Sequence, residues 1–216
     1  MFYNKNKISY LQQKYIYLNI FSLILLSFLI SSCTVLPKKI SNNMEDALKN
    51  ISLNYKDLDS LIVVNIESQE LLLFKKGQVE AKYTISSSVY GTGSRVNSFK
   101  TPLGKHIISE KIGHGLPKGA ILKARKWTGA IANIIKEPID TEFDVVTSRI
   151  LWLSGLEEGK NLGKGVDSKS RYIYIHGTAE EGLIGKPASD GCVRMYNSDV
   201  ISLFDRVDVN TEVWII

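Results

Sequence analysis

His176 and Cys192 are the two residues of this 216-residue chain whose side chains and spacing suit nucleophilic chemistry. Both lie in the stretch RYIYIHGTAEEGLIGKPASDGCVRMYNSD, where the histidine precedes a loop rich in Gly, Pro, Ser and Asp and the cysteine follows it. A free thiol has a pKa of about 8.5, and a neighbouring imidazole or cation lowers that value to roughly 3.5–7.5. The pair therefore indicates a cysteine nucleophile with a histidine base.

Gly191, directly before the cysteine, leaves room for a substrate carbonyl to approach the backbone of this turn. The amides near Gly191 and Cys192 are therefore candidates for an oxyanion hole. The alternative is that Cys192 is an inert, buried hydrophobic residue, as free cysteines frequently are, and that His176 only ends a strand. The glycine-rich turn favours the reactive interpretation, because a thiol placed there has little side-chain cover.

The order of these residues resembles the signature of a known family. After HGT, the run SDGCVRM places Cys192 sixteen positions beyond His176, with Arg194 two positions further on. This arrangement resembles the L,D-transpeptidase family, or YkuD domain. The resemblance implies that Cys192 is the nucleophile and His176 the general base, oriented by the backbone carbonyl of Gly177. It also implies that Arg194 helps to hold the substrate.

Two residues of the motif carry alternatives. Many members of the family have a second histidine directly before the Gly-Cys pair, where this chain has Asp190. Its carboxylate could orient His176 or be incidental. We expect it to be incidental, because a negative charge aimed at the sulfur would raise the pKa of the thiol. Arg194 could form a structural ion pair, for example with Asp199, rather than bind substrate.

The resemblance further implies an enzyme that acts on peptidoglycan stem peptides in cell wall biogenesis. The cysteine would attack the carbonyl before the terminal D-alanine, and the amine of a second stem, or water, would then take the acyl group. The residues alone indicate only thiol-dependent acyl transfer. Three other functions stay open: a carboxypeptidase or amidase with the same site, a non-catalytic lipoprotein that binds wall peptide, and an envelope scaffold.

A strand and a helix must position the motif. Alternation of polar or aromatic residues with isoleucine predicts a strand at 171–175, with His176 at its end before a break at Gly177. After the cysteine, Asn197 is expected to cap a helix at 198–206. Short apolar or alternating runs predict further strands at 61–66, 71–74, 79–86, 106–108, 145–154 and 212–216. Residues 60–216 are thus expected to form a mainly β, β-sandwich-like L,D-transpeptidase catalytic domain with one clear helix.

Residues 1–32 resemble a bacterial lipoprotein signal peptide. They hold three lysines and no acid, and their apolar run at 20–30 is shorter than the roughly 20 residues that span a bilayer. The run ends in ISSC, which resembles the lipoprotein cleavage box and implies that Cys33 is lipidated. Polar residues 33–59 are then a tether. The alternative is an uncleaved signal anchor, and either way we expect an exported domain tethered to a membrane in the cell envelope.

Charge and histidine spacing argue against two other classes of protein. Removal of 1–32 lowers the net charge from +5 to +2, which is too little to indicate nucleic-acid binding. His106 and His114 fit no recognised spacing of metal ligands. No metal and no cofactor are therefore expected.

The segment 112–142 is the part of the chain whose pattern predicts least. Its glycines indicate an irregular insertion, which could be a lid over the site or a plain surface loop. Trp127, inside it, and Trp152, after it, could line a cleft for a peptide, although large aromatic residues more often belong to the core.

Overall fold

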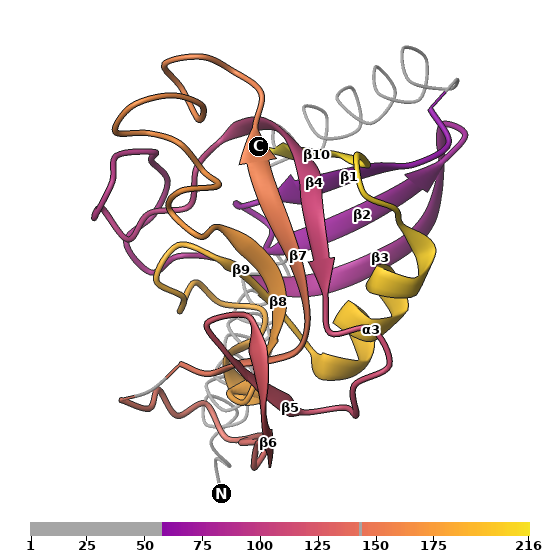
Figure 1. The fold of residues 1–216 in the computed structure, drawn as a ribbon, viewed down its shortest axis with the longest axis vertical. Helices are drawn as coiled ribbons and strands as arrows, with labels where there is room; N and C mark the ends of the chain where they lie inside the picture. Colours follow the sequence, from indigo (N-terminus) through magenta and orange to yellow (C-terminus); the bar gives the residue numbers. More distant parts are fainter. Residues whose placement is uncertain (1–57, 143) are drawn as a thin grey trace, which may run out of the picture. The chain divides into compact units, whose positions relative to one another are not determined.

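The computed structural model describes residues 58–142 and 144–216 (Figure 1). The expected signal peptide at 1–32, the expected lipidation site Cys33 and nearly all of the expected tether at 33–59 lie outside the described residues. Within the described part of the chain, no helix has both the length and the apolar content needed to cross a membrane.

The described residues form ten strands and one α-helix. The strands are β1 (Leu61–Asn65), β2 (Glu70–Lys75), β3 (Gln78–Ser86), β4 (Gly104–Ile112), β5 (Ala120–Lys123), β6 (Lys126–Ile131), β7 (Val146–Gly155), β8 (Tyr174–Thr178), β9 (Val193–Met195) and β10 (Glu212–Ile215). The helix is α3 (Asn197–Arg206), and one turn of 3-10 helix covers Glu181–Leu183. The prediction of a mainly β domain with a clear helix after the cysteine is confirmed.

Eight of these strands form a closed ring of pairings. They follow the order β4-β10-β1-β2-β3-β9-β8-β7, and β4 also pairs with β7, so the sheet closes on itself. In Figure 1, β1, β2 and β3 lie side by side, and β4 and β7 run at a steep angle to them. Closure leaves these eight strands without an unpaired edge. Strands β5 and β6 extend the sheet beyond β7 as a hairpin.

The main apolar core takes side chains from the ring and from the helix. Ile173 and Ile175 belong to it, as the alternation in this stretch predicts. Helix α3 adds Val200, Leu203 and Phe204, which form its buried face. Burial of each such side chain contributes roughly 1.5–3 kcal/mol to the free energy of unfolding. The core therefore holds β8, β9 and α3 in fixed positions relative to one another, and these elements carry or adjoin the residues of the motif.

The helix begins one residue earlier than predicted, and Asn197 is not its cap. Tyr196 occupies the N-cap position without a side-chain hydrogen bond, and Asn197 is the first helical residue. The buried amide of Asn197 is bonded elsewhere, since its Oδ1 accepts from Thr147 Oγ1 and Ser148 Oγ at 2.6 Å each. The capping prediction is wrong. The side-chain oxygen of Asn197 accepts hydrogen bonds from two hydroxyls of β7 and does not accept one from a backbone N–H of the helix.

Strand β8 begins and ends three residues later than predicted. Tyr172 has a φ of +57°, a turn conformation that a strand cannot include. Gly177 does not break the strand but lies inside it, paired with Thr147 of β7. His176 is consequently in the middle of a paired strand rather than at a free end, which restricts the motion of its backbone.

Candidate active site

Parallel pairing of β8 with β9 brings the thiol and the imidazole to one face of the sheet. Ile175 pairs with Val193 and His176 with Arg194, so Cys192 lies opposite Tyr174. Side chains alternate between the two faces of a strand, and residues two apart are separated by about 6.6 Å. The side chains of Cys192, Tyr174 and His176 therefore project to the same face. This register places the two halves of the motif on neighbouring strands.

The Cys192 sulfur makes two contacts with the backbone that leads into β8. Tyr174 N donates to Cys192 Sγ at 3.4 Å, and Sγ donates to the carbonyl of Tyr172 at 3.4 Å. Burial raises the pKa of the Cys192 thiol to about 12, and the hydrogen bond from Tyr174 N offsets only part of that effect. The resting sulfur is therefore a neutral thiol, which needs a base to become a nucleophile.

His176 is held in the form that such a base requires. Its side chain is buried, and Nδ1 lies 2.8 Å from the carbonyl oxygen of Gly177. A carbonyl can only accept, so Nδ1 must carry the hydrogen and Nε2 keeps a lone pair. Burial also lowers the pKa of His176, so the imidazole stays neutral. The expected orienting contact of Gly177 is present, and it leaves Nε2 available to take a proton.

Gly177 also permits a close approach of two other elements. A Cβ at this position would lie 2.7 Å from Asn197 Oδ1 and 2.8 Å from the carbonyl oxygen of Thr147. Asn197 Nδ2 donates to the carbonyl of Thr178 at 2.8 Å. The start of α3 is thereby bonded to β7 and to β8 around the histidine. The sequence motif contained Asn197, but its local position indicated a helix cap and gave no sign of this network.

The backbone of the turn before the cysteine has a conformation that favours a glycine. Gly191 has a φ of +119°, which residues with a side chain rarely adopt. Ser189 Oγ donates to the Cys192 carbonyl at 2.6 Å and accepts from Gly191 N at 3.3 Å. Ser189 thus holds the turn closed. The role of the Gly191 and Cys192 amides as an oxyanion hole stays a prediction.

Asp190 is exposed to solvent, whereas His176 is buried. The imidazole nitrogen that a third site residue would orient, Nδ1, is already bonded to Gly177. This geometry favours the interpretation that the Asp190 side chain is incidental.

Arg194 is entirely buried and forms ion pairs with two carboxylates. Its Nη1 lies 2.8 Å from Glu180 Oε2, which is also buried, and 3.1 Å from Asp144 Oδ2. Thr141 N donates to the other Glu180 oxygen at 2.7 Å. A substrate has no surface of Arg194 to touch in this conformation. The geometry therefore favours the structural alternative, with Glu180 and Asp144 as partners in place of Asp199, and substrate binding by Arg194 stays untested.

The β5–β6 hairpin gives the segment 112–142 its place beside the thiol. Leu122 of β5 packs in one apolar cluster with Ile150 and Tyr174, and Cys192 lies against this cluster. Every residue of β6 is exposed, and Ile121 with Thr147 is the one pairing between β5 and β7. The alternatives for this segment are a lid over the site and a plain surface loop. The packing of Leu122 beside Cys192 favours a segment that covers part of the site, and its central part is a hairpin.

The two tryptophans differ in their relation to the site. Trp152 of β7 is half-buried and stacks on Tyr172 at 5.7 Å and edge-on against Tyr174 at 5.6 Å between ring centres. Trp127 of β6 is 46% exposed, on the hairpin. Trp152 is therefore a wall of the candidate site, and Trp127 belongs neither to the core nor to that wall.

His106 and His114 take no part in the site that the motif forms. His106 is buried, with Nδ1 3.0 Å from the Gly104 carbonyl and Nε2 3.0 Å from Ser168 Oγ. His114 is exposed and stacks on Phe204. Among the described residues, no three His, Cys, Asp or Glu side chains gather as metal ligands. The absence of a metal and a cofactor stays a prediction.

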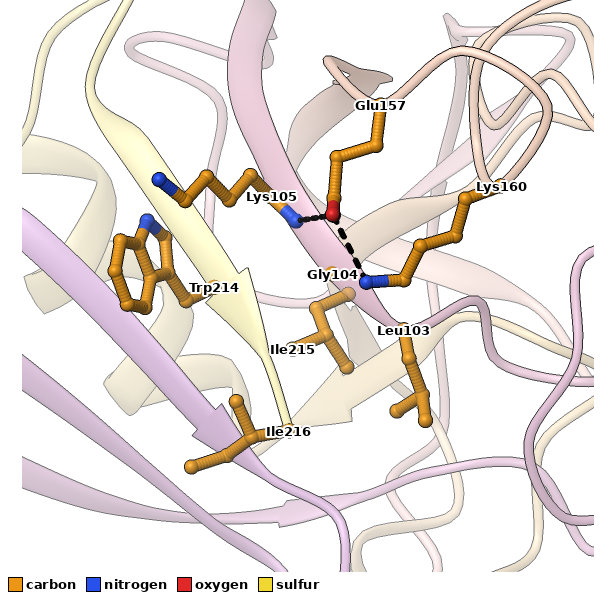
Figure 2. Close-up of a pocket in the computed structure, with 8 residues that line it drawn as sticks. All are labelled: Leu103, Gly104, Lys105, Glu157, Lys160, Trp214, Ile215 and Ile216. Atoms are coloured by element: carbon orange, nitrogen blue, oxygen red, sulfur yellow. Dashed lines mark hydrogen bonds and ion pairs between the residues drawn. The ribbon is translucent and has the colours of Figure 1, made fainter. Parts of the chain in front are cut away.

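A hollow of about 360 Å³ lies beside the start of β4, the end of β10 and the loop that follows β7 (Figure 2). Its lining residues are Leu103, Gly104, Lys105, Glu157, Lys160, Trp214, Ile215 and Ile216. In Figure 2, Glu157 Oε2 accepts from the backbone N of Lys105 at 2.6 Å and from Lys160 Nζ at 3.1 Å. These bonds join the loop that carries Glu157 to β4. The polar contacts beside the hollow therefore serve to hold this loop in place. Neither Cys192 nor His176 lines the hollow.

The geometry brings together groups that acyl transfer by a thiol would require: a thiol, a neutral imidazole with a fixed tautomer, and a glycine turn. The chain belongs to the L,D-transpeptidase catalytic domain family, YkuD, whose model matches residues 59–215. This match covers both halves of the motif and all ten strands.

The chain is also similar, over part of its length, to a curated protein and to solved structures. YqjB of Bacillus subtilis (strain 168), which carries L,D-transpeptidase in its name, is 47% identical over 53 residues, or 24% of this chain and 28% of YqjB. An L,D-transpeptidase from Mycobacterium smegmatis is 17% identical, with a TM-score of 0.46 over 73% of this chain and 58% of that one. L,D-transpeptidase 3 from Mycobacterium tuberculosis, in complex with a faropenem-derived adduct, is 14% identical, with a TM-score of 0.46 over 73% of this chain and 60% of that one. In each comparison the match spans less than two thirds of the other protein.

Proposed function

We propose that this protein is a cysteine-dependent L,D-transpeptidase that acts on peptidoglycan stem peptides through an acyl-enzyme on Cys192. The observation that carries the proposal is the register of β8 with β9, which puts the thiol and His176 on one face of the sheet. The bond from His176 Nδ1 to Gly177 supports it, because the remaining nitrogen is then a proton acceptor.

The reaction has two steps. Cys192 Sγ forms a bond to the carbonyl carbon before the terminal D-alanine while its proton passes to His176 Nε2. The C–N bond then breaks, the proton goes to the departing amine, and a thioester remains. In the second step the amine of another stem attacks the thioester and restores the thiol. Amides near Gly191 and Cys192 are candidates for binding the oxyanion in both steps.

The neutral thiol of the resting site fits this order of events. Because burial raises the pKa of Cys192 to about 12, a free thiolate is not present before substrate arrives. Proton transfer to His176 then accompanies attack on the carbonyl. A solvent-exposed thiolate would react with any electrophile, whereas this arrangement restricts reaction to a ligand that enters the site.

A mass measurement tests the proposal. The purified full chain should gain one acyl equivalent when mixed with a stem peptide that ends in D-alanine, or with a carbapenem, which the family resemblance implies mimics the donor. Peptide mapping should place the adduct on Cys192, and Cys192→Ala should form none. Cys33→Ala, which removes the other cysteine, is the matched control and should react as the wild type does. An adduct on Cys192→Ala would overturn the assignment.

The fate of the acyl group separates transpeptidation from hydrolysis. With an amine acceptor present, a transpeptidase yields a new amide, and a carboxypeptidase or amidase yields only the free acid. A non-catalytic wall-binding protein would yield neither product. We expect the amide, detected by mass analysis of wall fragments after incubation with the protein.

We further propose that residues 1–32 direct export and that Cys33 carries a lipid anchor in the cell envelope. The cleavage-box resemblance of ISSC supports this proposal. Replacement of Cys33 by Ser should move the protein from the membrane fraction to the soluble fraction. Unchanged membrane association would favour the uncleaved signal anchor.

A further inference from the structure

Two arginines of the candidate site, one beside the thiol and one against Tyr174, form no ion pair with a carboxylate within 4 Å. Among the described residues, the six ion pairs within 4 Å include neither Arg125 nor Arg171. Arg125 lies at the tip of the β5–β6 hairpin, and Arg171 lies just before β8. Guanidinium groups without an ion-pair partner at the site suit a substrate that carries negative charge.

Arg171 uses its donors on the protein itself. Its Nη2 donates to the Lys100 carbonyl at 2.7 Å and to Ser98 Oγ at 3.3 Å, and Nη1 donates to the Gly93 carbonyl at 3.3 Å. These bonds join the loop before β4 to the segment before β8. The same loop lies close to the turn at Gly191, where a Cβ would lie 3.4 Å from the Lys100 carbonyl oxygen. Arg171 therefore has a structural task, and few of its donors remain for a ligand.

Arg125 is placed differently, because its guanidinium lies against aromatic rings. Its Cζ is 4.7 Å from the centre of the Trp152 ring and 5.2 Å from that of Tyr172. Nη1 donates to Tyr174 Oη at 3.4 Å, which is a long hydrogen bond. A guanidinium stacked in this way keeps its planar fork of donors directed along its edges, in the geometry that matches a carboxylate.

Arg125 is linked to the Cys192 sulfur through Tyr174. Tyr174, which accepts from Arg125, donates its backbone N–H to Cys192 Sγ, and its ring lies 6.4 Å from that of His176. Arg125 thus packs against the Trp152 wall of the site while it stays partly exposed to solvent. One residue further on, Lys126 carries the same charge but is exposed.

We propose that Arg125 is a specificity-determining residue that binds a carboxylate of the donor peptide while Cys192 attacks. This inference rests on the proposed function, since it names the chemistry of the substrate of that site. The carboxylate could belong to the departing terminal residue or to the side chain of the residue that is transferred. Binding replaces the long bond to Tyr174 Oη by a bidentate, charge-assisted pair.

Paired donor peptides test the inference on the full chain. One donor has both carboxylates free, the second has the terminal carboxylate as an amide, and the third has the side-chain carboxylate as an amide. The variants are Arg125→Gln, Arg125→Lys and the matched control Lys126→Gln, each checked for an unchanged Tm. The measurement is kcat/KM for release of the terminal residue with each donor.

The wild type should prefer the free-acid donor over one of the two amides by about 10- to 100-fold, and the amide that reacts poorly identifies which carboxylate is bound. Arg125→Gln should lose about this factor on the free acid and little on that amide, so the preference should fall to about one. Arg125→Lys should keep part of the preference because it keeps the charge. Lys126→Gln should behave as the wild type does.

If Arg125 has only a structural role and holds the hairpin against the sheet, the expected rates with the three donors differ. Arg125→Gln would then change all three donors by the same factor and leave the preference intact, which would overturn the inference. Equal turnover of all three donors by the wild type would also overturn it while leaving the proposed function standing. No turnover of any donor, with no adduct on Cys192, would overturn both.

Discussion

Acidification should destabilise this domain through His106, and the size of the effect follows from its surroundings. The His106 side chain is fully buried between the Gly104 carbonyl and Ser168 Oγ. Desolvation by burial lowers the pKa of His106 from 6.5 to about 4. An unfolded chain exposes this imidazole to water, where it takes up a proton below pH 6.5, while the folded chain keeps it neutral.

The difference between the pKa of His106 in the unfolded chain and its pKa in the folded chain sets the direction and the size of the effect. Between pH 6.5 and about 4 the unfolded state binds one more proton at His106 than the folded state does, so the free energy of unfolding falls as the pH falls. The gap corresponds to about 3 kcal/mol, because each pKa unit equals about 1.4 kcal/mol. Nearly all of this stability is present at pH 7 and lost by pH 4.

Urea unfolding at pH 7 and pH 4 measures the effect, with His106→Gln as the comparison. A glutamine can still donate to Gly104 and accept from Ser168, but it cannot take up a proton in this range. The loss of stability between the two pH values should be about 3 kcal/mol smaller in the variant than in the wild type. His176 and all carboxylates are common to both proteins and cancel. Losses that agree within about 1 kcal/mol would refute the reasoning.

Four further predictions concern the site. Replacement of Asp190 by Asn should slow acylation by less than about tenfold; a thousandfold loss with an unchanged circular dichroism spectrum would mean that its carboxylate orients the base. Arg194→Ala should lower the free energy of unfolding by about 3–5 kcal/mol, because it leaves Glu180 buried without its cation, whereas reduced acylation at full stability would point to substrate binding. Gly177→Ala should cost about 1–3 kcal/mol and slow acylation, since its Cβ would meet Asn197 Oδ1 at 2.7 Å; a variant with wild-type Tm would contradict the close packing. Because burial lowers the pKa of His176, the acid limb of the acylation rate should lie below pH 6.5, and a limb above pH 6.5 would show that another group is the base.

Local pattern predicted the elements whose side chains alternate or repeat. The burial of Ile173 and Ile175, and of one face of α3, follows from periods of two and of 3.6 residues that are visible in the sequence. The motif fixed His176 and Cys192 as candidates, and pairing of β8 with β9 brings them to one face. These features depend on residues that are neighbours in the sequence or belong to one motif.

The features that the sequence did not predict depend on contacts between residues that are far apart in the chain. Thr141 and Glu180 are 39 positions apart, and Thr147 and Asn197 are 50 apart, yet each pair is hydrogen-bonded. No periodicity signals such a pair, because each side chain also has an ordinary local use, such as a cap or a surface charge. The positive φ of Tyr172 likewise moved the start of β8 against the alternation of its side chains. Burial of Arg194 against two carboxylates could be inferred only after the strands were placed.

The proposed base and the proposed recognition residue are held in the structure in opposite ways, and the difference suits the tasks proposed for them. His176 lies in a strand paired on both sides, with Nδ1 bonded to Gly177 and with Asn197 tying α3 to both neighbouring strands. A proton acceptor must not move relative to the nucleophile, because small displacements are costly in rate. Arg125 lies on a hairpin whose outer strand is wholly exposed and which is attached by one pairing to β7. Segments with few buried contacts open at low free energy. The exposed outer strand and tip of the hairpin can therefore shift to admit a peptide to the partly buried thiol, and place the guanidinium on it, while the histidine stays fixed.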